Sequence, residues 1–418
     1  MYSLKMKDLI RDSFKGITPN YVDHSNVIVL NQKCIRNNQI DFSLARFHDS
    51  KKTYPSKKEL QVGDILINST GAGTAGRCAF IRELPKNYSV VADSHILVVR
   101  ISDFFIAGCV QYGLFNIEKL LQTFLDGSTG QGEFDKQRLL NVIIPIPNNP
   151  KYIYQFLSNL DKKIVLNKQI NARLEEMAKT LYDYWFVQFD FPDANGKPYK
   201  SSGGEMVFDE TLKRKIPKGW EVKSLGTHIT IKRGISYKSN EIKDTGIPFI
   251  NLNSFYLDGK FKFEGTKFFT GKIKNDDFIS SGDLLIAVTD VTRNADIIGK
   301  AFILPDLFNN SPVMSCDVAK ISSSELNNFY LERLFNSSSY HEYIKYFASG
   351  TLVLHLDIKG ISWFDAYIPP KILLDKFEDF CRDIHLRIVE TEKQNYRLTQ
   401  LRDFLLPMLM NGQVSVAE

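Results

Sequence analysis

The stretch IYQFLSNLDKKIVLNKQINARLEEMAKTLYDYW, residues 153–185, decides the fold, because its seam residues recur in alternating steps of four and three. That spacing places them on one face of a helix and is typical of a coiled coil. The seam positions are Ile153, Leu157, Leu160, Ile164, Asn167, Asn171, Leu174, Ala178, Leu181 and Trp185. We therefore predict a long helix that packs against a second helix.

The same seam returns 224 residues later, from Ile153 to Phe377, with polar residues again at two consecutive positions in its middle. Polar residues inside a seam fix the register of a helix pair. We predict that helices near 152–187 and 376–411 pack antiparallel, and we expect Pro407 to end or kink the second helix. The second seam holds Phe377, Cys381, Ile384, Ile388, Thr391, Asn395, Leu398, Arg402 and Leu405. The predicted interface comprises Leu160, Ile164, Asn167, Asn171, Leu174, Ile384, Ile388, Asn395 and Leu398.

The segments before the two helices also repeat. VGDILI (62–67) returns as SGDLLI (281–286), and GRCAFI (76–81) returns as GKAFI (299–303). Gly16-Ile17-Thr18 likewise matches Gly234-Ile235-Ser236. The common order of these matches indicates a duplicated unit, and a repeat has to be identified before any fold is assigned.

Short runs rich in Val, Ile and Leu, broken by Gly, Pro and Asn, predict strands in both units. The expected strands cover residues 65–67, 96–99, 142–146 and 284–288. The fold class is therefore α+β, with two repeated α/β domains and two long antiparallel helices. The predicted segments are a first globular domain (1–149), a central helix (150–189), a connector (190–215), a second globular domain (216–371) and a C-terminal helix (372–418).

Composition restricts the class of protein. The chain has 418 residues, of which 43% are hydrophobic and 24% charged, and these are globular values. Its five cysteines include no Cys-x-x-Cys pair, and no stretch approaches the ~18 apolar residues of a membrane span. We expect a soluble, cytoplasmic protein. A net charge of +5 permits a nucleic-acid partner without requiring one.

Motifs that would support catalysis are weak. Residues 71–76 match the glycine fingerprint of dinucleotide sites, but a strand pattern follows where a helix is needed. Asp193 and Glu221 fit the spacing of a metal-dependent nuclease, although the connector between them reads as turns and loops. The seven histidines are scattered singly. We predict no catalytic residues, no bound cofactor and no metal in this chain.

A binding protein with two repeated modules and no catalytic site is well matched to double-stranded DNA, because each module can read one part of the duplex. We expect the loops after the two Gly-Asp strands to approach the DNA, since Gly permits close contact and Thr, Gln, Asn and Arg supply hydrogen-bond donors. The predicted DNA-binding residues are Ser69, Thr70, Gly71, Gly73, Thr74, Arg77, Ser128, Thr129, Gln131, Lys232, Arg233, Thr289, Thr292, Arg293, Asn294 and Thr351.

The whole chain resembles the specificity subunits of type I restriction–modification systems. The segments that carry this resemblance are LDKKI (160–164), NKQIN (167–171), LEEMA (174–178), WFVQFDF (185–191), GKPY (196–199), SSGGEM (201–206) and IPKGW (216–220). The resemblance implies two target-recognition domains that each read half of a split DNA site, with two helices as a spacer. It also implies two modification subunits that hold S-adenosylmethionine and methylate adenine, and restriction subunits that can join them in host defence.

Two alternatives stay open at the level of the sequence. The first is a helical scaffold or adaptor that does not bind DNA, which would have the seams but no basic loops. The second is a degenerate nuclease that uses Asp193 and Glu221. The DNA-recognition hypothesis accounts for the duplication, the helices and the missing active site together.

Overall fold

The computed structural model describes residues 2–71, 73–126 and 132–416. The chain divides into two compact units, one made of Met1–Leu166 with Asn395–Glu418 and the other of Asn167–Gln394. The predicted segments have different bounds, because the structure shares each long helix between both units. Within the described residues, no helix is both long enough and apolar enough for a membrane span.

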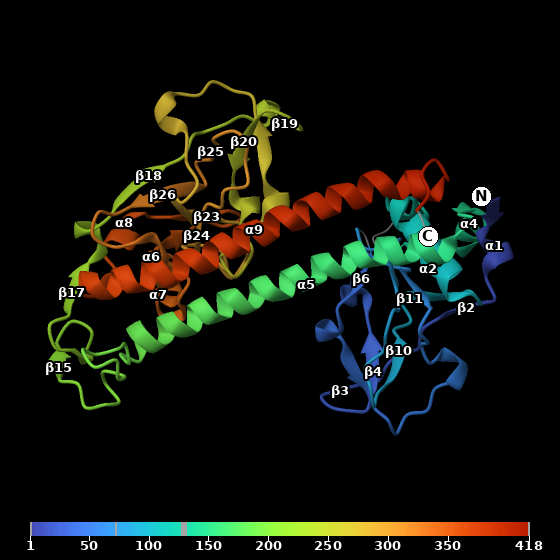
Figure 1. The fold of residues 1–418 in the computed structure, drawn as a ribbon, viewed down its shortest axis with the longest axis horizontal. Helices are drawn as coiled ribbons and strands as arrows, with labels where there is room; N and C mark the ends of the chain where they lie inside the picture. Colours follow the sequence, from blue (N-terminus) through green and yellow to red (C-terminus); the bar gives the residue numbers. More distant parts are fainter. Residues whose placement is uncertain (1, 72, 127–131, 417–418) are drawn as a thin grey trace. The chain divides into compact units, whose positions relative to one another are not determined.

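Two long helices dominate the ribbon (Figure 1), α5 (Pro150–Tyr182) and α9 (Lys371–Met410). They pair antiparallel: in unit 2, Asn171 contacts Thr391 and Trp185 packs on Phe377, while in unit 1 Asp161 contacts Arg402. The antiparallel prediction is therefore confirmed.

The end of α9 departs from expectation. We expected Pro407 to end or kink the helix; the helix continues through Pro407 to Met410, so the first of these alternatives is wrong. Leu406, Leu409 and Met410 are buried in the core of unit 1, and this packing holds the last turn in place. Leu401, one turn earlier on another face of the helix, is 43% exposed.

Unit 1 contains two four-stranded sheets. The first has the order β2-β11-β8-β9 and the second β10-β4-β7-β3, while β1 pairs with β14. The strands are β1 (Tyr2–Lys5), β2 (Asp12–Lys15), β3 (Tyr21–Val22), β4 (Val27–Leu30), β7 (Arg46–His48), β8 (Ile65–Asn68), β9 (Cys78–Phe80), β10 (Ser89–Ala92), β11 (Ile96–Arg100) and β14 (Ile143–Ile146). The helix α2 (Phe104–Asn116) begins after Asp103, whose carboxylate accepts a hydrogen bond from the amide of Ile106.

Unit 2 repeats this topology. Its sheets have the orders β18-β26-β22-β24 and β25-β20-β21-β19, and β17 pairs with β29. The strands are β17 (Glu221–Ser224), β18 (Thr230–Arg233), β19 (Ile242–Lys243), β20 (Ile247–Ile250), β21 (Lys267–Phe269), β22 (Leu284–Ala287), β24 (Ala301–Ile303), β25 (Val313–Met314), β26 (Val318–Ser322) and β29 (Asp365–Ile368). The directions also agree, because β4 with β10 and β20 with β25 are the matching parallel pairs. The predicted duplication is thus a duplication of fold.

The repeated Gly-Asp motif has a structural cause. Gly63 and Gly282 have φ of +99° and +89°, a conformation that favours glycine. The carboxylate of Asp64 accepts the amide of Gln61 at 2.8 Å, and Asp283 accepts the amide of Ser280 at the same distance. The motif therefore closes the turn that starts β8 and β22, and it fixes where each following loop begins.

The connector is more ordered than we expected. We interpreted residues 190–215 as turns and loops, but β15 (Met206–Asp209) pairs with β16 (Arg214–Pro217). Phe189 is buried against Trp220 and anchors the start of the connector in the core of unit 2.

Candidate nucleic-acid interface

In unit 1, the loop after β8 is a tight turn built on glycine. Gly71, Gly73 and Gly76 have φ of +90°, +77° and +84°. A Cβ on Gly76 would lie 2.8 Å from the backbone nitrogen of Gln122. The turn leads into the strand β9, whereas the dinucleotide fingerprint requires a helix at this point of the chain.

A hairpin packs beside this loop. Its strands are β12 (Leu125–Asp126) and β13 (Glu133–Phe134). Thr70 forms a bridge with Glu133, and the amide of Phe134 donates to the carbonyl of Ser69 at 2.8 Å. The two segments that we assigned to the DNA surface of unit 1 therefore meet, although Ser128, Thr129 and Gln131 lie outside the described residues.

Unit 2 joins the equivalent segments in the same way. After β22, the strand β23 (Thr289–Asp290) pairs with β28 (Leu354–Leu356), which pairs with β27 (Ala348–Ser349). The amide of Leu356 donates to the carbonyl of Val288 at 2.9 Å, the counterpart of the Phe134–Ser69 bond. Each unit thus carries one surface composed of a loop and a hairpin.

The loop of unit 2 is held from the inside by Asp290. Its buried carboxylate accepts hydrogen bonds from the amides of Thr292 at 2.6 Å, Ile297 at 2.6 Å and Ile298 at 3.0 Å. Arg293 and Asn294 lie between these anchors and are exposed. A guanidinium and an amide are therefore presented on a preorganised turn, which lowers the entropy cost of binding.

Equivalent threonines in the two units have different partners. The Thr70 hydroxyl lies 2.9 Å from Nδ1 of His95, whereas the Thr289 hydroxyl donates to the carboxylate of Asp317 at 3.0 Å. An imidazole in one unit thus replaces a carboxylate in the other. The two surfaces offer different charge and hydrogen-bonding groups, as two readers of different sequences would need.

Basic residues end the outer strand of each main sheet. Arg233 of β18 lies opposite Ala319 of β26, which lies opposite Ile286 of β22. Because β18 and β22 run in the same direction, Arg233 and the neighbouring Lys232 reach the sheet end from which residues 289–294 leave. Both side chains are exposed.

Lys15 is a residue that our sequence reasoning missed. It ends β2 in unit 1 and forms an ion pair with Glu133 of the hairpin. The match of Gly16 with Gly234 makes Lys15 the counterpart of Arg233, so the repeat held the signal. His95 and His355 also lie beside the loops. No motif or repeat in the sequence indicated a role for them; only their being histidines did.

The predicted DNA-binding residues differ in exposure. Gly73, Lys232, Arg233, Arg293, Asn294 and Thr351 are exposed, and Thr70, Gly71, Thr74, Arg77 and Thr292 are partly exposed. Ser69 and Thr289, however, are almost fully buried. Contact with DNA does not suit these two side chains, because burial removes them from the surface. They position the loops instead.

A polar layer lies inside the helix pair of unit 2. The amide of Asn171 donates to Glu392 at 2.7 Å, and its oxygen accepts from the Thr391 hydroxyl. Asn167 lies 3.5 Å from Gln394. Burial raises the pKa of Glu392, opposed by the bond from Asn171. The polar positions of the seam therefore contact one another across the pair.

In unit 1, the buried carboxylate of Asp161 on α5 contacts both α9 and the sheet-containing part of the unit. It accepts hydrogen bonds from Arg82 at 2.9 Å, from the Tyr112 hydroxyl at 2.6 Å and from Arg402 at 3.0 Å. Removal of one partner from such a buried pair costs about 3–5 kcal/mol. Asp161 lies next to the predicted seam and was not among our interface residues.

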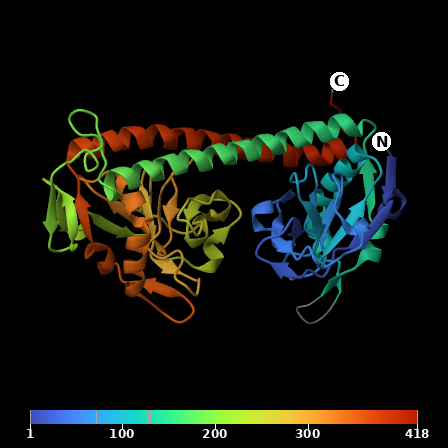
Figure 2. The same cartoon turned by 90° about the horizontal axis from the view of Figure 1, so that it is seen from below.

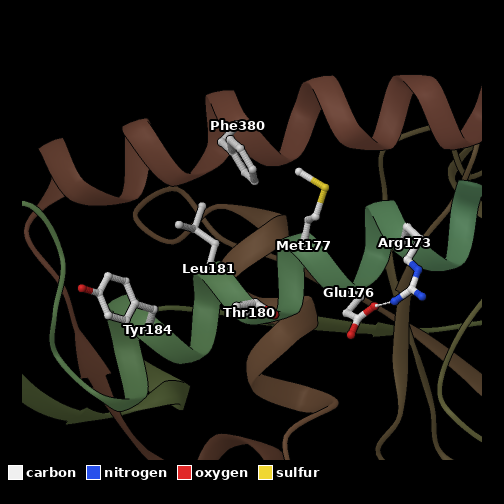
Figure 3. A pocket seen from close by; sticks show the side chains of 7 residues that line it. All are labelled: Arg173, Glu176, Met177, Thr180, Leu181, Tyr184 and Phe380. Carbon is white, nitrogen blue, oxygen red and sulfur yellow. Dashed lines mark hydrogen bonds and ion pairs between the residues drawn. The ribbon is translucent and has the colours of Figure 1, made fainter.

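A second stripe, on α5 and on the π-helical turn Asp183–Val187 that directly follows it, is exposed. Ile170, Met177 and Tyr184 recur every seven residues, and none of them belongs to the seam that faces α9. Met177 and Tyr184 line a hollow of about 480 Å³ together with Arg173, Glu176, Thr180, Leu181 and Phe380 (Figure 3). Figure 3 shows Met177, Leu181 and Phe380 pointing into the space between α5 and α9. Exposed apolar patches of this kind are typical of protein interfaces.

The nuclease alternative finds no support in the described part of the chain. The Asp193 carboxylate accepts the amides of Asn195 and Lys197, which closes a turn, and Glu221 pairs with Lys223. No group of three or more His, Cys, Asp or Glu residues in residues 2–71, 73–126 and 132–416 could hold a metal ion.

Comparisons with known proteins point to one family. Residues 15–176 match the family described as "Type I restriction modification DNA specificity domain". The chain is 27% identical to the MjaIX specificity subunit of Methanocaldococcus jannaschii, over 73% of this chain and 69% of that protein. It is 23% identical to the HindI specificity subunit of Haemophilus influenzae, over 94% and 95%. The crystal structure of a type I S subunit from M. genitalium has the same fold, with a TM-score of 0.59, 14% identity and coverage of 98% and 95%.

Proposed function

We propose that this chain is a specificity subunit of a type I restriction–modification system, which reads a bipartite sequence in double-stranded DNA and positions the catalytic subunits of its complex. The observation that carries this proposal is the duplicated topology. Each unit joins a loop after its Gly-Asp strand to a hairpin. As a specificity subunit, the chain is not itself an enzyme.

The two surfaces would read different half-sites. A loop and a two-stranded ribbon are of a size that enters the major groove, where each base pair presents a distinct pattern of donors and acceptors. Arg293 and Asn294 are suited to guanine and adenine, respectively, by the geometry of their hydrogen bonds. Lys15, Lys232 and Arg233 would contact phosphates and set the orientation on the duplex.

We further propose two modification subunits as partners. They would hold S-adenosylmethionine and methylate adenine, and restriction subunits would join them for cleavage. The subunits would act in the cytoplasm, where the chromosome of the cell is accessible to a defence system. The exposed stripe of Ile170, Met177 and Tyr184 supports a helical partner, because its seven-residue spacing suits a further helix of a bundle.

A methylome comparison tests the proposal. We expect cells that express this chain and its modification subunit to methylate adenines in one split sequence, and cells without this gene to lose that methylation entirely. Replacement of residues 216–371 by the corresponding domain of a relative should change one half of the sequence and leave the other half intact.

A methylome that is unchanged without the gene would contradict the proposal. In that case the scaffold alternative would gain support, particularly if the purified complex bound target and scrambled duplexes with equal affinity.

A further inference from the structure

The hairpin of unit 2 ends in an exposed apolar tip. Leu352 has 88% of its surface exposed, and Val353 beside it is also exposed. Figure 2 shows the orange hairpin on the side of unit 2 away from α5 and α9. Neither side chain packs in the hydrophobic core of unit 2, so the fold does not explain why these positions are apolar. Exposed apolar groups that do not support the core are typical of interaction sites.

A third exposed apolar residue lies at the same end of the paired strands. Thr289 lies opposite His355 and Asp290 opposite Leu354, so Val291 follows the last paired residue of β23 and Val353 precedes the first paired residue of β28. Val291 is 62% exposed. The apolar group therefore adjoins Arg293 and Asn294, the exposed polar residues of the loop.

The tip needs a glycine to form. Gly350 has a φ of +140°, and a Cβ at this position would lie 2.0 Å from the carbonyl oxygen of Val353. Such an approach excludes other residues. The hairpin is thus tightly closed, and Leu352 extends from a defined support.

The corresponding segment of unit 1 has the sequence GSTGQG, residues 127–132, with no apolar side chain. The apolar residues of unit 2 are a feature of that unit alone, which suits a role in distinguishing its DNA sequence from the other half-site.

We propose that Leu352, supported by Val353 and Val291, contacts the 5-methyl group of thymine in the half-site read by unit 2. This inference rests on the proposed function. The thymine methyl is the apolar group that distinguishes bases in the major groove, and a two-stranded ribbon fits that groove. Arg293 and Asn294 would bond to the polar edges of neighbouring bases from the adjoining loop.

Replacement of thymine by deoxyuridine tests this contact, because it removes only the methyl group. The full chain is assembled with its modification subunit, and its affinity is measured for target duplexes in which each thymine is replaced in turn. We expect a loss of about threefold to tenfold at one or two positions in a single half-site, the magnitude of one buried methyl or slightly more. Leu352→Ala should bind the normal target more weakly and should no longer distinguish thymine from deoxyuridine.

Leu257→Ala is the control, since Leu257 is an exposed leucine of unit 2, with 62% of its surface exposed, and its loop is held to α5 by the Lys260–Glu175 ion pair. Leu257→Ala should still distinguish thymine from deoxyuridine, as the wild type does. The inference is overturned if Leu352→Ala also distinguishes the two bases, or if the half-site of unit 2 contains no thymine. A 2-aminopurine signal for base unstacking that depends on Leu352 would also overturn it, in favour of an intercalating wedge. Equal binding of target and scrambled duplexes by the wild type would instead contradict the proposed function itself.

Discussion

At the scale of single residues, the buried groups of the loops fix where the exposed ones lie. Asp290 binds three backbone amides and leaves Arg293 and Asn294 on the surface. A buried anion that is satisfied by backbone donors makes such a turn rigid. The effect of a substitution in this loop will therefore depend on which side of the turn the side chain faces.

Arg293→Ala tests the exposed side. If the guanidinium pairs with guanine, affinity should fall by about 1–3 kcal/mol and specificity should relax in one half-site only. If it contacts phosphate, binding should weaken for all sequences. The slope of the logarithm of affinity against the logarithm of salt concentration should then become shallower by about one. Binding to target and variant duplexes at several salt concentrations separates the two results.

Arg387→Ala is the control for this variant, because Arg387 is exposed on α9. Unchanged affinity together with unchanged methylation specificity in the Arg77→Ala/Arg293→Ala double variant would show that these loops are not the DNA surface.

His341 gives unit 2 a pH dependence. Burial, together with the nearby ammonium groups of Lys300 and Lys345, lowers its pKa from 6.5 to about 4. The unfolded chain therefore binds this proton first as the pH falls, so the stability that neutral His341 contributes is present above pH 6.5 and is lost toward pH 4.

Thermal melting between pH 7.5 and 4.5 should show a smaller loss of stability for His341→Gln than for the wild type, since glutamine cannot take up a proton. Parallel melting curves for the two proteins across this range would contradict the assignment to His341.

At the scale of elements, α5 and the π-helical turn Asp183–Val187 after it present two stripes with different roles. One faces α9, where Asn171 contacts Thr391 and Glu392. The other exposes Ile170, Met177 and Tyr184. A heptad pattern read from sequence favours one seam per helix, and a second stripe becomes evident only when burial has shown which side chains remain uncovered.

Met177→Glu should impair assembly with the modification subunit, because a charge would be buried in an apolar contact. We expect co-purification of the modification subunit to fall at least about tenfold, in keeping with the penalty of an unpaired charge. DNA-binding specificity of the isolated chain should be unchanged. Ala172→Glu places the same charge on an exposed part of α5 outside the stripe and should assemble normally. Normal assembly of Met177→Glu would exclude the stripe as the docking surface.

At the scale of the whole molecule, the chain should depend on partners for activity. We expect the purified chain alone neither to methylate nor to cleave DNA. Methylation should appear when its modification subunit and S-adenosylmethionine are added together. A radioactive methyl-transfer assay with each component omitted checks this expectation.

Robust methylation or cleavage by the chain alone would refute it. Loss of that activity in Asp193→Ala would then favour the nuclease hypothesis, whereas activity that persisted in this variant would require a catalytic site elsewhere.

The sequence alone determined the duplication, the long helices, their antiparallel pairing and the main strands. These features follow from local periodicity and from repeated short motifs, which are properties of neighbouring residues. The same information placed the loops after the Gly-Asp strands, because Asp64 and Asp283 close turns within a few residues.

Only the tertiary structure decided which groups meet across long separations. Asp161 contacts Arg402 at the far end of the chain, Lys15 pairs with Glu133, and the last turn of α9 continues through Pro407 into the core of unit 1. The burial of Ser69 and Thr289 is also a tertiary property, and their backbones pair with hairpin segments that are distant in the sequence. Such contacts depend on packing between segments that are distant in the sequence, and a local sequence pattern therefore does not predict them.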